Sequence, residues 1–153
     1  AISALILTQI VYKKVDLTMV LNGALAGLVS ITAEPLTPGL GAATLIGGVG
    51  GVIVVFAVPL LDKFKIDDVV GAIPVHLIAG IWGTLAVVIT NPDATLMAQL
   101  TGIVVIGLFT FIVSLIVWMI LAKTMGIRVS EEAEMAGLDN SELGMDSYPE
   151  FSR

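Results

Sequence analysis

The sequence predicts an all-α, polytopic membrane helix bundle, and three observations support this fold class. Hydrophobic residues make up 57% of the 153 residues and charged residues 13%, whereas soluble domains carry about 25% charged residues. Four uncharged runs follow one another along the chain, and each reaches the roughly 17 to 25 residues that a spanning helix needs. Counting the short apolar segment at the start, the basic residues follow only the first, third and fifth apolar segments. A water-soluble fold of this composition would expose large apolar patches.

The uncharged runs set the boundaries of the expected elements. Residues 1–12 are apolar but cover only about half a span, so we expect them to be the second half of a helix in a longer protein. Residues 1–127 then form the transmembrane bundle, and residues 128–153 form an acidic tail with seven acids and two bases. Four complete helices are expected near residues 17–33, 41–61, 68–90 and 95–122.

The basic residues predict the orientation of the bundle. They follow the half-span, the 41–61 helix and the 95–122 helix, with one more at the end of the tail: Lys13, Lys14, Lys63, Lys65, Lys123, Arg128 and Arg153. The segments 34–40 and 90–95 contain no Lys or Arg. If each helix crosses once, every basic segment lies on one side, which the positive-inside rule makes cytoplasmic. We therefore expect an integral protein of the plasma membrane with a cytoplasmic C-terminus.

Small residues predict where the helices pack. In lipid, close approach of helices depends on small side chains rather than on hydrophobic burial. Gly23 and Gly27 form one G-x-x-x-G face, and Gly47 and Gly51 form another. We interpret both as packing seams of a tight bundle. They are not a phosphate-binding loop, because no strand precedes them and no Lys-Ser or Lys-Thr pair follows.

The 68–90 helix is predicted to carry the functional site, because it holds the one histidine of the chain. At about 100° per residue, one arc of this helix carries small and polar side chains: Asp68, Ala72, Val75, His76, Ala79 and Gly83. Bulky apolar residues fill the opposite side. The small stripe is expected to face other helices or a narrow lumen. We predict that its members Asp68, Ala72, Val75 and His76 belong to a transport pore.

His76 lies about eight residues past the predicted helix start, which is roughly 12 Å and close to mid-membrane. Burial disfavours the charged imidazolium, so we expect a neutral ring with one donor and one acceptor. The side chain either forms an interhelical hydrogen bond that holds the bundle or belongs to a permeation path. Ionisable groups inside a membrane favour the second interpretation.

The residues before His76 are expected to shape its helix. Pro74 removes one backbone hydrogen bond, so it either kinks the helix just before His76 or does no more than shape the bundle. Asp67 and Asp68 are placed to cap the helix N-terminus. For Asp68 a second role, at an inner vestibule, stays open.

These motifs resemble those of a known family. The stretch that reads DDxxGAIPVHxxAGIWG from Asp67 to Gly83 is similar to the tenth helix of ammonium transporters of the Amt/Mep/Rh superfamily. The tail resembles that family's cytoplasmic signature through GIRVSEE from Gly126, AGLD from Ala136, and Tyr148. The resemblance covers essentially the whole chain.

The resemblance implies an eleven-helix, inverted-repeat fold that assembles as a homotrimer with one pore in each subunit. This chain would supply half of the seventh helix, the eighth to eleventh helices and the tail. His76 matches the second histidine of a mid-pore pair, whose first member lies outside this chain. The implied cargo is ammonium or ammonia, or methylammonium. A PII-type signalling protein is an implied cytoplasmic partner, beside membrane lipid, and the implied regulatory tail residues are Gly137, Leu138, Asp139 and Tyr148.

Three positions depart from the family pattern. Many members carry another acid where this chain has Gly71, and Phe where it has Ile73. A common His-Gly pair of the tail is Leu143-Gly144 here. These departures concern the inner vestibule and the docking of the tail, and they leave His76 unaffected.

The tail sequence predicts local structure of its own. Ser130 can cap a short helix that holds Glu131, Glu132 and Glu134 and that stops at Gly137. Asp139 can begin a further turn. The tail is either solvated and partly disordered, or docked under the pore.

Other functions are weighed against transport. An ammonium sensor of the same fold would carry an extra signalling domain after the tail. A proton-conducting subunit of a larger membrane complex would hold several ionisable residues inside its spans, and here only His76 lies inside one. An enzyme, a metal site or a cofactor is not expected, because no nucleophile–base pair, paired carboxylates or ligand cluster is present. No basic patch supports nucleic-acid binding.

Overall fold

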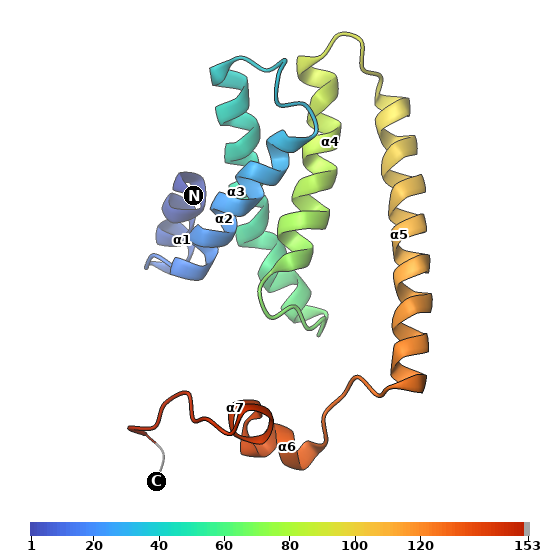
Figure 1. Ribbon diagram of the computed structural model, residues 1–153. Helices are drawn as coiled ribbons and strands as arrows, with labels where there is room; N and C mark the ends of the chain where they lie inside the picture. The colour runs from blue at the N-terminus through green and yellow to red at the C-terminus, as the bar shows by residue number, and fades with distance from the viewer. Residues whose placement is uncertain (152–153) are drawn as a thin grey trace. The chain divides into compact units, whose positions relative to one another are not determined.

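The computed structural model describes residues 1–151, and all the regular secondary structure in this range is helical (Figure 1). Arg153, at the end of the predicted tail, lies outside these residues. The all-α prediction is confirmed. The elements are α1 (Ile2–Tyr12), α2 (Leu17–Thr32), α3 (Leu40–Lys63), the π-helix η1 (Ile73–Ile78), α4 (Ala79–Thr90), α5 (Leu96–Thr124), α6 (Glu131–Ala136) and α7 (Leu138–Leu143).

Three helical stretches among the described residues are long and apolar enough to cross a membrane: Leu40–Lys63, Ile73–Thr90 and Leu96–Thr124. The protein is therefore an integral membrane protein built as a bundle of helices. The predicted span at 17–33 is shorter than expected, because α2 has 16 residues. The half-span is likewise a helix of 11 residues, α1.

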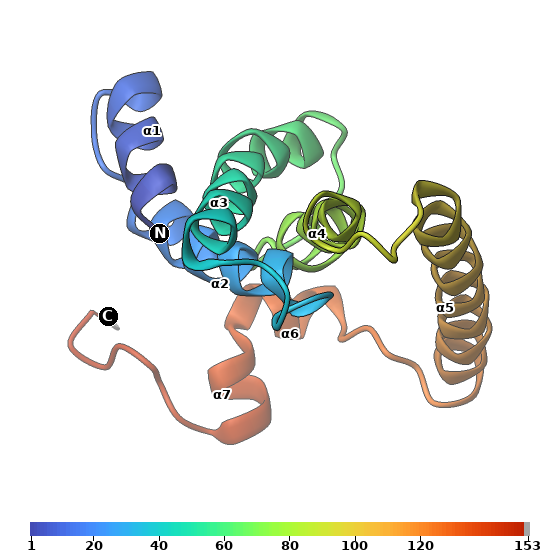
Figure 2. The same cartoon turned by 90° about the horizontal axis from the view of Figure 1, so that it is seen from above.

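The chain divides into two compact units, Ala1–Ile106 and Gly107–Arg153. The first unit contains α1 to α4 and the beginning of α5, and the second contains the rest of α5 and the tail. In the first unit α2 packs against both α3 and α4 (Figure 2). No residue of α5 is buried, as expected for a helix whose surroundings are lipid or other protein.

Small residues hold α2 against α3, as the sequence predicted. A Cβ added to Gly27 would lie 3.3 Å from the carbonyl oxygen of Gly47, and one added to Gly23 would lie 3.7 Å from the Cα of Gly51. The two G-x-x-x-G faces therefore meet. Because neither backbone carries a side chain at these points, the helices approach closely enough for dispersion contacts between backbones.

Polar side chains of α1 attach it to α3. The Ser3 hydroxyl donates to the carbonyl oxygen of Gly48 at 2.8 Å, and the Tyr12 hydroxyl donates to that of Val55 at 3.2 Å. Ala4 and Thr8 lie fully buried between these two contacts. A carbonyl oxygen can accept a second hydrogen bond in addition to its helical one, so these contacts hold α1 without breaking α3.

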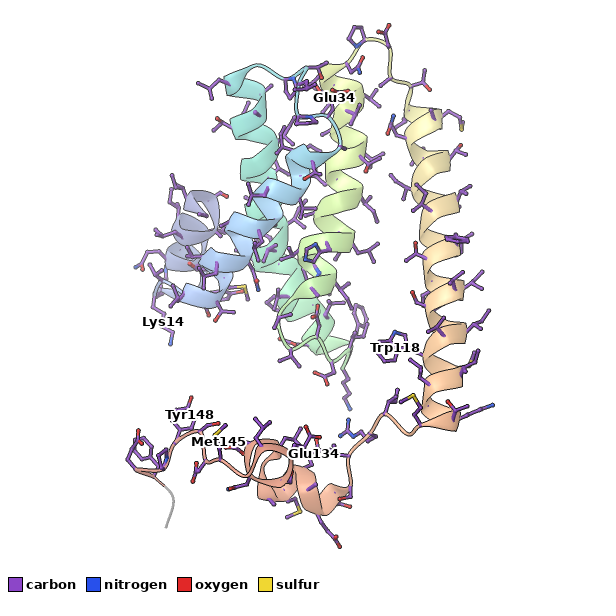
Figure 3. The ribbon with its side chains drawn as sticks, in the orientation of Figure 1. Lys14, Glu34, Trp118, Glu134, Met145 and Tyr148 are labelled. Atoms are coloured by element: carbon purple, nitrogen blue, oxygen red, sulfur yellow. The ribbon has the colours of Figure 1, made fainter. Side chains whose placement is uncertain are left out.

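The two ends of the first unit differ in charge. Lys14 and Glu34 lie at opposite ends, as Figure 3 shows. At the Glu34 end, the amide nitrogen of Asn91 donates to the Glu34 carboxylate at 2.9 Å and joins the α2–α3 loop to the end of α4. The basic segment after α1 and the Lys-free loops are thus at opposite ends, as the orientation argument requires.

Candidate functional site

The helix that carries His76 begins later than predicted, because Asp68 caps it from outside. The Asp68 carboxylate accepts hydrogen bonds from the backbone amides of Ala72 and Ile73, both at 2.8 Å. Gly71 adopts a left-handed conformation with φ of 75°, which other residues rarely adopt. The segment from 68 to 71 is therefore a turn, and the helix starts at Ile73 rather than at Asp68. The capping role predicted for Asp68 is confirmed.

The first turns of this helix are π-helical, from Ile73 to Ile78. The amide of Ala79 donates to the carbonyl oxygen of Pro74, five residues earlier, where an α-helix would use the residue four earlier. Pro74 occupies the first turn, in which its missing N–H costs no helical bond. No helical hydrogen bond is lost at Pro74, and a wide turn follows it.

The wide turn splits the stripe that α-helical spacing predicted. Val75 is 1% exposed and Ala79 is fully buried, whereas Ala72 and His76 are exposed. The expectation that Val75 shares the face of His76 is wrong. The face on which His76 lies also carries Ala72, and the packed face carries Val75, Ala79 and Gly83.

The packed face fixes the level of His76 within the first unit. Val75 and Ala79 form a buried cluster with Ala26 of α2 and Val54 of α3. Both partners come from the middle part of their helices. His76 follows Val75 directly, so it lies level with the middle of these helices although its own helix has only just begun.

Two further polar groups support this region, and only one of them was anticipated. The indole nitrogen of Trp82 donates to the carbonyl oxygen of Ile46 at 3.0 Å, which agrees with its predicted packing role. Asn22 is buried in α2, and its amide nitrogen would lie 2.7 Å from a Cβ added to Gly71. A single amide within an apolar run was the signal that could have drawn attention to Asn22.

Replacing Asp68 with alanine is expected to destabilise the protein by about 1–3 kcal/mol, because two helix amides lose their acceptor. The measurement is the denaturation midpoint of the full-length protein in detergent. Asp67→Ala is the matched control, since Asp67 is exposed and its loss should change stability by less than about 0.5 kcal/mol. Equal midpoints for the two variants would contradict the capping role.

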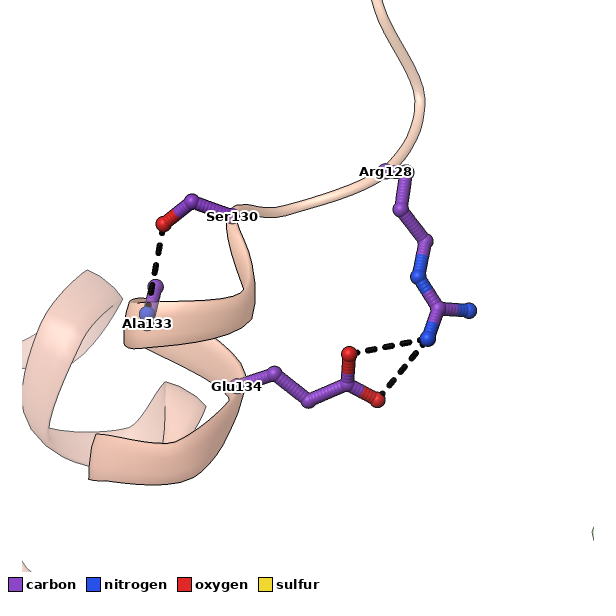
Figure 4. Close-up of polar contacts among 4 residues, drawn as sticks. All are labelled: Arg128, Ser130, Ala133 and Glu134. Atoms are coloured by element: carbon purple, nitrogen blue, oxygen red, sulfur yellow. Dashed lines mark hydrogen bonds and ion pairs between the residues drawn. The ribbon is translucent and has the colours of Figure 1, made fainter.

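The tail of the second unit forms the two predicted turns of helix. The Ser130 hydroxyl accepts from the amide of Ala133 at 3.2 Å and caps α6, which ends at Gly137 with φ of 93°. One guanidinium nitrogen of Arg128 bonds both carboxylate oxygens of Glu134, at 2.8 and 2.9 Å (Figure 4). Both side chains are more than half exposed, so the pair adds little stability.

The tail residues singled out from the sequence lie around α7. Leu138 is its first residue and is partly exposed. The Asp139 carboxylate accepts from the amide of Ser147 at 2.9 Å, which closes the loop after α7. The amide of Tyr148 donates to the Asp146 carboxylate at 2.9 Å.

The closed loop predicts a pH dependence. The amide of Ser147 donates to the carboxylate of Asp139 and holds the pKa of that carboxyl below its ordinary value. Because the folded pKa is lowered, the loop is fully stabilised above the ordinary pKa and loses that stability as the pH falls through the lowered value. Asp139→Ala should reduce the hydrogen-exchange protection of the Ser147 amide several-fold at pH 7. Unchanged protection, with Asp146→Ala as the control, would contradict this.

No group of three or more His, Cys, Asp or Glu side chains that could hold a metal ion occurs among residues 1–151. The site is therefore a single imidazole on the free face of its helix. The turn capped by Asp68 precedes it along the chain, and the packed face lies on the other side of the helix. An imidazole has two ring nitrogens, so one can donate a hydrogen bond while the other accepts one.

Comparisons with known proteins give the family. Residues 1–148 match the family described as the Ammonium Transporter Family. The chain is 37% identical to the ammonium transporter Amt2 of Archaeoglobus fulgidus over 171 residues, which cover 99% of this chain and 36% of that protein. It is 39% identical to the ammonium transporter Amt1 of Haloferax mediterranei over 157 residues, which cover 99% of this chain and 30% of that protein. The chain thus spans about a third of the length of these curated relatives, and it belongs to the ammonium transporter family.

Proposed function

We propose that the full-length protein transports ammonium across the membrane through a pore, and that this chain supplies the pore wall that carries His76. The observation that carries the proposal is the exposure of His76 on the free face of its helix, level with the middle of α2 and α3. A histidine that only held this bundle together would lie on the packed face, where Val75 and Ala79 lie.

The physical problem for such a pore is the choice between ammonium and potassium, which are similar in size. Moving a small ion from water into a dry apolar pore costs on the order of 20 kcal/mol in the idealised limit. Ammonium can avoid this cost by giving up its proton and crossing as neutral ammonia, and potassium cannot. A neutral imidazole can accept a hydrogen bond from ammonium, and it can accept one from ammonia or donate one to it, so it can take part in the proton transfer.

The residues of this chain then have distinct roles. His76 is the hydrogen-bond partner and proton-relay member. The resemblance implies that the other histidine of the pair, its first member, lies outside this chain. Ala72 lines the same wall with a small side chain. Asp68 holds the turn beneath the wall through the amides of Ala72 and Ile73, and Val75 anchors the helix from behind.

The assembly and orientation form part of the same proposal. The full-length protein is a homotrimer of the plasma membrane with its C-terminus in the cytoplasm, as the segregated basic residues favour. Its acidic tail couples subunits and receives a PII-type protein near Gly137, Leu138, Asp139 and Tyr148. A pull-down of the full-length protein with such a partner, with and without residues 128–153, tests this part.

Uptake of labelled methylammonium into liposomes that hold the full-length protein tests transport itself. We expect uptake that ammonium competes away and that protein-free liposomes lack. Binding of ammonium without any uptake would instead support a sensor of the same fold and would contradict the proposal.

A further inference from the structure

The buried positions of the His76 helix keep one stripe only because of its π-turn. After the turn, the buried residues are Ala79, Gly83, Ala86 and Val87. Their spacing of three and four residues is the ordinary α-helical one. Before it, the buried residues are Gly71, Pro74 and Val75. In a continuous α-helix Pro74, nine residues before Gly83, would lie about 180° from it. Pro74 is nevertheless fully buried, so one extra residue is accommodated between the two groups.

A continuous α-helix would place His76 on the packed face. His76 is seven residues before Gly83, which corresponds to a rotation of about 20° from it at 100° per residue. Gly83 packs against α2 so closely that an added Cβ would lie 2.5 Å from the carbonyl oxygen of Ser30. In α-helical register the imidazole would therefore point toward the backbone of α2.

The π-turn shifts the direction of the His76 side chain around the helix axis by a full residue, or about 100°. Residues up to His76 are turned as a block relative to Ala79 and the residues after it. Val75 then takes the packed position, where it is 1% exposed, and His76 moves to the free face beside Ala72. π-turns are rare and recur at functional sites, which agrees with a role here.

We infer that the π-turn from Ile73 to Ile78 is a positioning element that turns His76 out of the packing stripe and toward the conduit. The number of residues between Gly71 and Ala79 therefore sets the direction of the imidazole. Val75 is the positioning residue, because it fills the packed position that His76 would otherwise occupy. The inference rests on the proposed function in one respect only, namely that the space in front of the His76 side chain is the conduit.

Two single-residue deletions in the full-length protein separate the effects of length and direction. Deleting Leu77 removes the extra residue after His76, so the helix becomes α-helical while His76 stays on the free face. Deleting Val75 also makes the helix α-helical, but it places His76 in the packed position. We expect the Leu77 deletion to keep ammonium-driven current and the Val75 deletion to reduce it more than about tenfold, the scale of a lost proton-transfer group. Equal currents for the two deletions would overturn the inference.

A spectroscopic measurement decides the matter if a deletion variant does not fold. This chain has no cysteine, so a nitroxide can be attached at one introduced cysteine in a cysteine-free full-length background. We expect high label mobility for His76→Cys and for Ala72→Cys, and low mobility for Val87→Cys, whose position is 7% exposed. A label at position 76 as immobile as the label at 87 would overturn the inference.

The same label distinguishes this inference from the proposed function. A second spin probe attached to a lipid acyl chain reports lipid at the label, because it cannot enter a pore that excludes lipid. A mobile label that this probe does not reach supports both claims. A mobile label that this probe reaches supports the positioning role of the π-turn and contradicts the pore.

Discussion

Full-length protein with His76 replaced by alanine is expected to lose ammonium-driven current almost entirely. Proton-transfer groups commonly contribute rate factors of about 10² to 10⁴, and a methyl group can neither accept nor donate a proton. The helix should be unaffected, because His76 is exposed and lies outside the buried cluster. Current recorded from proteoliposomes on a solid-supported membrane measures the effect.

Leu77→Ala is the matched control for His76→Ala. Leu77 is the next residue, is 54% exposed and lies in the same π-turn. Its truncation should leave the current within a factor of about two, since no proton-carrying group is removed. Ammonium-selective current in His76→Ala equal to that of the unaltered protein would contradict the relay role of the imidazole.

Gly50→Val is expected to disrupt the packing of α2 against α3. A Cβ at this position would lie 2.7 Å from the carbonyl oxygen of Ala26 and would also meet the Ser30 hydroxyl. The Ala26 carbonyl belongs to the backbone and cannot rotate away as a side chain can, so one of the two helices must move. Overpacking of this kind typically costs about 1–3 kcal/mol or more. The denaturation midpoint of the full-length protein in detergent should fall accordingly.

Gly48→Ala provides the control two residues away on the same helix. A Cβ at Gly48 meets nothing within 4 Å, and alanine has a higher helix propensity than glycine by up to about 1 kcal/mol. The midpoint should therefore stay or rise slightly. A fall of equal size in Gly48→Ala and Gly50→Val would contradict the account, because only Gly50 lies close to the Ala26 backbone.

Much of this fold was predictable from the sequence, because the local helix signals and the apolar runs that a membrane requires indicate the same segments. The charge-free runs gave helices whose ends differ from the predicted ones by a few residues, α4 excepted. The glycine pairs of α2 and α3 predicted packing seams, and the structure shows that the two seams meet, with Gly27 against Gly47. Ser130 and Asp68 predicted helix caps that form, since a side-chain acceptor before a helix has few other ways to bond.

The register of the site was not predictable in the same way. A uniform 100° per residue assigned Val75 and His76 to one face. In the structure Val75 is buried on the packed face, whereas His76 is exposed on the free face. The left-handed Gly71 and the late helix start depend on where the chain returns from α3, which is a tertiary effect. The π-turn likewise places Val75, rather than His76, in line with Ala79 and Gly83 on the packed face, and no local pattern encodes that placement.

The central claim is that a wall carrying His76 passes ammonium by proton transfer and excludes ions that cannot give up a proton. Its most direct test is the current through the full-length protein under equal, separately applied gradients of ammonium and potassium. We predict a current with ammonium and none above the protein-free level with potassium. A potassium current comparable to the ammonium current would contradict the account.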